Sequence, residues 1–304
     1  MREMESATAT PAGSRGLIAV VMAPVGSAIR FARSSVLGAV ALVILIAVIL
    51  TAVFADLLAP HDPLQAFFTE LRKPPSTTYP LGTDYIGRDV LSRIIFGSRV
   101  TLIVAFVSIG IGSGLGIIWG IVTGYFGGKF DLITQRFLDV LMSFPTVILA
   151  LLLLAALGAG ILTVIIAIAV VSIPNSTRIT RSVALTVSEM AYVEAARAVG
   201  ASPKRIMMLH IAPQCWAAAL VIASAGLGVA IFAEAALSFL GLGIPPPTPT
   251  WGNMLGGLLS NLFKPPWWLV IFPGIAITIT ILAFNLLGDA LRDYLDPRLR
   301  GKLQ

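Results

Sequence analysis

Glu234 is the residue of this 304-residue chain whose type and surroundings most clearly point to chemistry. It is the only acid between Glu194 and Asp289, and it directly follows a long uncharged run. An ionisable group in such a setting is a functional candidate, because removing a charge from water is costly. The alternatives are an acid near the outer membrane interface or one that pairs with a neighbouring helix. We therefore expect Glu234 either to line a pathway or to hold the structure together.

Residues suited to catalysis are otherwise scarce. No serine lies in the Gly-x-Ser-x-Gly setting of many hydrolases. Segment 124–130, Gly-Tyr-Phe-Gly-Gly-Lys-Phe, resembles a phosphate-binding loop at first sight. However, its first glycine is one residue too close, and Phe130 stands where Ser or Thr should coordinate magnesium. We expect a non-catalytic chain that has no cofactor of its own and does not hydrolyse ATP.

Segment 178–213 carries a clear pattern of helix start and stop signals. Ser188 can cap a helix that begins at Glu189 and runs to residue 199, and Gly200 occupies the position of a left-handed C-cap. The residues of this helix that a partner could contact are Glu194, Ala195, Ala196 and Arg197.

A second helix is expected directly after this turn. Ser202 can cap it, Pro203 suits its first position, and Pro213 is expected to end the unit. The sequence therefore predicts a helix–turn–helix between two apolar runs. Tethering at both ends argues against DNA binding, and a surface loop without a partner is the remaining alternative.

The elements that must position these residues follow from the scarcity of charge. Charged residues make up 12% of the chain and hydrophobic ones 57%, whereas soluble proteins are about 25% charged. A membrane span needs about 20 apolar residues. The uncharged gaps admit six spans, near 36–55, 100–122, 139–157, 160–177, 214–233 and 268–288. The uncharged gap 235–263 is interpreted as a loop, because it contains a cluster of prolines.

The distribution of basic residues predicts the orientation of these spans. Fifteen of the 21 lysines and arginines lie in segments that share a side with the N-terminus, and six lie on the opposite side. The positive-inside rule then places both termini in the cytoplasm. The net charge of +6 is explained by topology, so we expect no nucleic-acid partner. His61 and His210 fall on opposite sides of the membrane, so we expect no shared metal site.

Several apolar residues are expected to shape the spans. Glycines repeat every four residues along the second span and would share one helix face, where another backbone can approach closely; they are Gly112, Gly116, Gly120 and Gly124. Pro145, Pro174 and Pro273 can kink spans or mark their ends. Tryptophans 251, 267 and 268 flank the last outer loop, where the membrane interface favours them.

Three motifs resemble those of one known family. Glu194-Ala195-Ala196, Gly200 and Pro213 are similar to the "EAA" signature of ABC-importer permease subunits, although His210 and Ala212 stand where Ile and Leu are usual. Segment 81–97 resembles the stretch before the second span in the C-type subunits of dipeptide, oligopeptide and nickel permeases. Segments 234–243 and 285–297 resemble further hallmarks of these subunits. The resemblance covers roughly residues 36–300.

The resemblance implies an all-α membrane protein with six transmembrane helices, a permease core of five helices plus one N-terminal helix. Residues 1–35 would be a cytoplasmic segment, and 36–99 the first span and an extracytoplasmic loop. The permease domain would be 100–290 with its coupling loop at 189–213, and 291–304 a cytoplasmic tail. Such a chain would be a multi-pass protein of a bacterial inner or plasma membrane.

The resemblance also implies partners and a transported substrate. The partners would be a homologous second permease, two ABC ATPases that bind ATP and magnesium, an extracytoplasmic substrate-binding protein, and membrane lipid. The expected function is ATP-driven import of dipeptides or oligopeptides, coupled to the ATPases by the EAA loop. The alternatives are a permease for nickel or another small solute, or a secondary transporter that uses Glu234 as its coupling acid.

Overall fold

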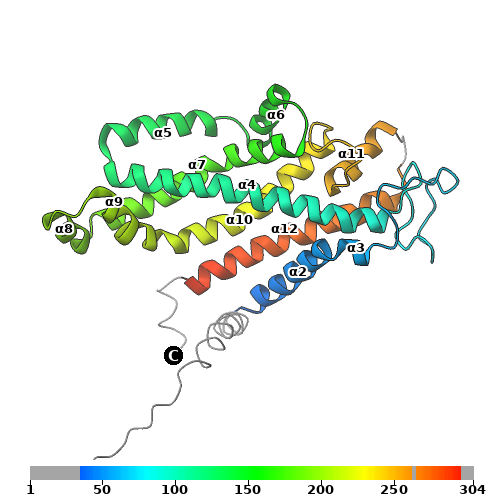
Figure 1. Cartoon of the computed structure of the whole chain (residues 1–304), viewed down its shortest axis with the longest axis horizontal. Coiled ribbons are helices and arrows are strands. Elements are labelled where there is room, and N and C mark those ends of the chain that lie inside the picture. The colour runs from blue at the N-terminus through cyan, green and yellow to red at the C-terminus, as the bar shows by residue number, and fades with distance from the viewer. Residues whose placement is uncertain (1–34, 262–264, 296–304) are drawn as a thin grey trace, which may run out of the picture.

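The computed structural model describes residues 35–261 and 265–295. In these ranges the chain is helical, apart from loops and one isolated bridge between Thr83 and Asp89. Figure 1 shows the long helices side by side, with the short helix α8 (Ala191–Ala198) at one end and α11 (Trp251–Asn261) at the other. We refer to these as the α8 end and the α11 end.

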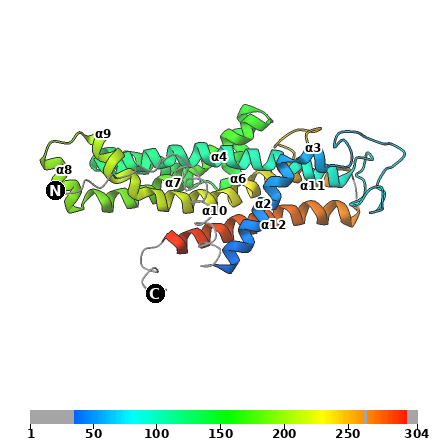
Figure 2. The same cartoon turned by 60° about the horizontal axis from the view of Figure 1, so that its bottom comes forward.

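Five helical segments are long and apolar enough to cross a membrane. They are α2 (Val36–Val53), α4 (Val90–Phe126), α7 (Ile161–Ser188), the segment Pro203–Phe239, and α12 (Trp267–Leu295). Short α3 (Ala55–Leu58) follows α2. In Figure 2, α2 crosses α12 at one side of the bundle. The predicted spans near 36–55, 100–122, 160–177, 214–233 and 268–288 all fall on these segments, and most of the helices extend well beyond them.

The predicted span near 139–157 is sharply bent beside Pro145, one of the prolines expected to kink spans or mark their ends. This region contains α5 (Gly128–Met142) and α6 (Thr146–Leu157), whose axes differ by 87°. The break is at Ser143-Phe144-Pro145, because Pro145 is held in an extended conformation and becomes the N-cap of α6. The described chain therefore has five spans, or six if the bent pair counts as one.

The glycine-rich face of α4 packs directly against α7. A Cβ atom added to Gly112 would lie 1.9 Å from Ser172 Oγ, and one added to Gly120 would lie 2.6 Å from the Thr177 carbonyl oxygen. Gly116 and Gly124 face α7 in the same way. Larger side chains at these positions would push the two helices apart.

The interpretation of 235–263 as a loop is only partly right. Helix α10 (Ala212–Phe239) continues to residue 239, a loop occupies 240–250, and α11 begins at Trp251. The prolines of this region lie in the loop, so they do not prevent either helix. Thr250 caps α11, since its hydroxyl accepts a hydrogen bond of 3.2 Å from the Asn253 amide.

Prolines inside the spans do not end their helices. Pro174 lies within α7 and Pro273 within α12, and both are buried. Each removes one backbone donor from its helix.

Candidate functional site

Helix α8 is positioned by the end of α7 rather than by the predicted serine cap. Ser188 is the last residue of α7, and its hydroxyl donates to the Leu185 carbonyl at 2.8 Å. Glu189 is the C-cap of α7, and α8 starts two residues later after Met190. The prediction that Ser188 caps a helix beginning at Glu189 is therefore wrong, because the apolar helix continues further than its charges indicate.

One face of α8 is anchored and the other is open. Val193 is fully buried in a cluster that includes Ile206 and Ile211, and Ala196 packs against the same cluster. Glu194, Ala195 and Arg197 are exposed. Just beyond the helix, Val199 is 84% exposed. This arrangement presents a short helix to a partner while apolar packing fixes its inner face.

The turn after α8 requires a glycine for conformational reasons. Gly200 has φ +80°, and a Cβ atom there would meet no neighbour within 4 Å. The Gly200 amide donates to the Arg197 carbonyl and the Ala201 amide to the Ala196 carbonyl, both at 3.0 Å. These two bonds form a Schellman motif, which ends the helix sharply.

The second helix of this unit joins the fifth span without interruption. Ser202 caps α9 (Pro203–Ile206) by accepting from the Arg205 amide at 3.4 Å, and Pro203 occupies the first turn. A π-helical turn, η1 (Met207–Ile211), then connects α9 to α10. Pro213 does not end the unit as predicted. It lies in the first turn of α10, where the helix tolerates proline.

Two aromatic contacts hold the α8 end together. The Arg197 guanidinium lies 5.1 Å from the centre of the Tyr125 ring at the end of α4. The Tyr192 and His210 rings are 6.1 Å apart and join α8 to η1. Of the site residues predicted here, Glu194 and Ala195 point away from the bundle, whereas Ala196 and Arg197 contact it.

Glu234 lies far from this end, near the last turn of α10. Its side chain is completely buried. The Thr101 hydroxyl of α4 donates to Oε2 at 3.2 Å, and the Ser238 hydroxyl donates to Oε1 at 2.8 Å. Ser238 Oγ also accepts from the Ile244 amide at 3.3 Å, so the network includes the loop after α10. These contacts join α10 to α4 and to the loop that follows α10.

The α11 end also contains a cluster of buried charges to which the sequence analysis assigned no role. Asp84 Oδ2 accepts from Arg88 Nε at 2.7 Å and lies 3.8 Å from Arg93 Nε. Arg93 Nη1 also donates to the Pro63 carbonyl at 3.1 Å. Asp89 caps α4 by accepting from the Ser92 amide at 3.0 Å. Together these contacts fasten the loop 59–89 to the start of α4. The one sequence signal for this cluster was the density of charged residues immediately before the apolar run of α4.

The tryptophans at the α11 end differ in their surroundings. Trp251 and Trp268 are buried, and their indole nitrogens donate to the Ile94 and Thr83 carbonyls at 3.0 and 3.3 Å. Only Trp267 is largely exposed among these three. Two of the predicted interface residues therefore fix α11 to the start of α4 and α12 to the loop before it.

The described residues contain no group of three or more His, Cys, Asp or Glu side chains that could hold a metal ion. His61 lies in the loop at the α11 end, where its amide donates to Ser92 Oγ at 3.0 Å. His210 lies in η1 at the α8 end. The two histidines are thus at opposite ends of the bundle.

Comparisons with known proteins identify the class of this chain. The model of a family described as the binding-protein-dependent transport system inner membrane component matches residues 116–301. The model of the N-terminal transmembrane domain of oligopeptide transport permease C matches residues 24–75. The chain therefore belongs to the family of binding-protein-dependent transport permeases, and the resemblance inferred from its motifs is confirmed.

Individual relatives are similar over nearly their whole length. The glutathione transport system permease protein GsiD of Pectobacterium atrosepticum is 40% identical over 90% of both chains. The di/tripeptide transport system permease protein DppC of Pseudomonas aeruginosa is 39% identical over 86% of this chain and 88% of its own. GsiD of Escherichia coli is 39% identical over 90% and 89%, respectively. The all-α, multi-pass architecture of a transport permease is thus supported by both the fold and the relatives.

Proposed function

We propose that this chain is a permease subunit of an ATP-driven importer for short peptides. Its relatives include permeases of glutathione and di/tripeptide systems, and both of these substrates are short peptides. The structural observation that carries the proposal is α8, a short helix with an anchored inner face and an exposed outer face. A second permease of the same family would complete the translocation pathway.

The α8 end faces the cytoplasm in this proposal. The excess of basic residues on this side supports that orientation. Both termini would then lie in the cytoplasm of a bacterial cell, with this subunit in the inner membrane. Two partner ATPases would bind ATP and magnesium, so this subunit itself would be non-catalytic. An extracytoplasmic binding protein would deliver the peptide to the α11 end.

Coupling would pass through α8 as a rigid body. A partner that binds Glu194, Ala195 and Val199 would move α8. Because Val193 packs against the ends of α7 and η1, that movement would be transmitted to both. Each state of the ATPases would then favour one state of the permease by binding it more tightly. The turn at Gly200 would keep α8 and α9 at a fixed angle to each other.

Substitution of Gly200 tests this role. Gly200→Val forces a β-branched residue into a left-handed conformation, which costs about 1–2 kcal/mol or more. We expect peptide uptake to be lost while membrane insertion is retained. Gly200→Asn should retain most uptake, because asparagine adopts this conformation more readily. The assay is uptake of Ala-Ala and of glutathione by the complete transporter reconstituted with its ATPases and binding protein.

Gly158 provides a matched control for strain. It has φ +88° and, like Gly200, open space where a Cβ atom would lie, but it is placed between α6 and α7 at a distance from α8. Gly158→Val should leave ATPase binding and its coupling to transport intact. Normal uptake by Gly200→Val with the ATPases bound would remove the coupling role from this turn.

A further inference from the structure

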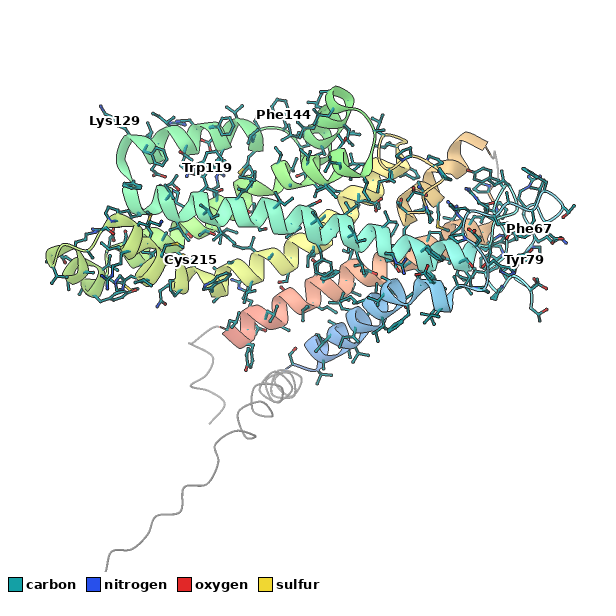
Figure 3. The ribbon with its side chains drawn as sticks, viewed as in Figure 1. Phe67, Tyr79, Trp119, Lys129, Phe144 and Cys215 are labelled. Carbon is teal, nitrogen blue, oxygen red and sulfur yellow. The ribbon has the colours of Figure 1, made fainter. Side chains whose placement is uncertain are left out.

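The bend between α5 and α6 borders a cavity of about 470 Å³. The cavity also contacts α4, α7 and α10, and Figure 3 shows Phe144 at the bend itself. Its volume lies within the range of about 300–1,000 Å³ that is typical of small-molecule sites. The residues that the structure places around it are mainly apolar and include no charged side chain.

Asn175 is the most informative residue in this lining. It lies midway along α7, directly after Pro174, and its side chain is exposed. Its side-chain amide makes no hydrogen bond within the part of the chain that the structure describes. A primary amide in contact with lipid tails would lose its hydrogen bonds to water without replacement. Asn175 therefore faces water, a ligand or another chain when the protein is in a membrane.

The polar character continues along the same face of α7. Ser172, Asn175, Arg178 and Ser182 recur at intervals of three or four residues, which places them on one side of the helix. Arg178 forms an ion pair with Asp139 of α5. A row of polar groups along a membrane span indicates a face directed toward water rather than toward lipid.

Thr146 is a second polar residue without a partner at this cavity. It begins α6 on the opposite side of the bend and is exposed, and its hydroxyl makes no hydrogen bond to the described residues. The neighbouring Ser172 and Ser176 differ, since their hydroxyls donate to the Ala169 carbonyl at 2.8 Å and to Ser113 Oγ at 3.2 Å. Two exposed polar groups from two helices, neither with a partner among the described side chains, thus border one cavity whose other hydroxyls are hydrogen-bonded.

We propose that this cavity is a binding site for the backbone of the transported peptide, with Asn175 and Thr146 supplying its hydrogen bonds. The proposal rests on the function proposed above and names a site for it. The amide of Asn175 offers one acceptor and two donors, which complement the C=O and N–H of a peptide bond. The apolar lining accommodates side chains without selecting among them. The absence of charge in the lining suits a site that binds the backbone rather than a particular ionic group.

Cysteine substitution tests whether the cavity is open to water. Cys215 is the only cysteine of the chain and is buried, so Cys215→Ala removes the native thiol from this chain. Modification is then followed on this chain, separated from its partner subunits. Asn175→Cys and Ile166→Cys are then compared in the complete transporter, using a charged, water-soluble methanethiosulfonate reagent applied to both sides of the membrane. Ile166 is a matched control, because it is 40% exposed on the same helix but lies outside the cavity lining.

Modification at residue 175 should be at least about tenfold faster than at 166, because the reactive thiolate forms only in contact with water. Saturating Ala-Ala or glutathione should slow the modification at 175 and leave that at 166 unchanged. Equal rates at the two positions would overturn the proposal and would indicate that lipid or the second permease covers Asn175.

Transport kinetics provide an independent measurement. Asn175→Leu keeps the approximate size of the side chain but removes its hydrogen bonds, and we expect a loss of about three- to tenfold in uptake efficiency. Asn175→Gln should recover part of the loss, because it restores the primary amide. Ile166→Leu is the control and should be neutral.

Uptake and protection from modification together distinguish failure of the binding site from failure of the proposed peptide transport. If the wild-type transporter takes up neither Ala-Ala nor glutathione, both proposals are overturned. If uptake is normal but neither peptide slows modification at 175, only the binding site is overturned.

Discussion

The charges around Asp84 at the α11 end and those on α8 and α9 at the other end are arranged in opposite ways. At the α11 end, Asp84, Arg88 and Arg93 are at most 6% exposed and contact one another. At the α8 end, Glu194 and Lys204 are exposed and form no ion pair with the residues that the structure describes. Buried pairs fasten a loop to the bundle, whereas unpaired surface charges remain available to another chain.

This difference indicates where stability and function reside. Removing one member of a buried ion pair leaves an uncompensated charge and is strongly destabilising. Removing an exposed, unpaired charge changes stability little. The α11 end should therefore respond to substitution mainly through folding, and the α8 end mainly through interactions with partners.

The largest expected effect is at Asp84. Asp84→Asn leaves Arg88 and Arg93 buried without their carboxylate, and we expect a loss of about 3–5 kcal/mol in the free energy of unfolding. Thermal unfolding of the purified protein in detergent measures this loss. Asp56→Asn is the control, because Asp56 pairs with Arg99 at 2.9 Å but its side chain is 70% exposed; that change should cost less than about 1 kcal/mol. Similar losses for both variants would contradict the comparison.

The next effect concerns the apolar anchor of α8. Val193→Ala removes two buried methyl groups, which should cost about 2 kcal/mol. The loss should appear locally, as faster amide hydrogen exchange in α8 with little change in the spans. Val199→Ala serves as the control, since Val199 is 84% exposed and its truncation should leave exchange unchanged.

A smaller effect is expected for the contact between Arg197 and Tyr125. The guanidinium lies 5.1 Å from the ring centre, and an exposed cation–π contact contributes about 0.5–1 kcal/mol. A double-mutant cycle of Arg197→Gln and Tyr125→Leu should give a coupling energy of this size in thermal unfolding. A coupling energy of zero would show that the contact does not hold α8.

The smallest effect on stability is expected at Glu194. Glu194→Gln should change the free energy of unfolding by less than about 0.5 kcal/mol. Co-purification of the ATPases should nevertheless decrease, because the side chain is exposed on the face proposed to bind them. Destabilisation comparable to that of Asp84→Asn would show that the two ends do not differ as described.

The long elements are predictable from the sequence because charge is excluded from membrane spans in a simple way. Five spans appear where the uncharged runs indicate them, and the turn at Gly200 has the left-handed conformation that its neighbours suggest. Pro145 indicates a possible helix end, but the 87° angle of the bend is not predictable from it. Such an angle depends on packing between helices, which no local pattern encodes.

The errors at the candidate site have a related cause. Ser188 and Pro213 carry strong local signals for a helix start and a helix end, yet both lie within continuous helical segments. Burial of apolar neighbours such as Val187 and Ile211 outweighed these preferences. The cluster around Asp84 received no role because its pairings join residues of a loop to the start of α4, and sequence order alone does not reveal which charges meet.

The uninterrupted segment Pro203–Phe239 has a mechanical consequence. Its 37 residues span about 55 Å at 1.5 Å per residue, and they connect the exit of α8 to the buried carboxyl of Glu234. A rotation of about 5° around one end would displace the other end by about 5 Å over this length. If α8 binds the ATPases as proposed, the segment would act as a lever arm that converts a small tilt at the α8 end into a larger movement beside Glu234.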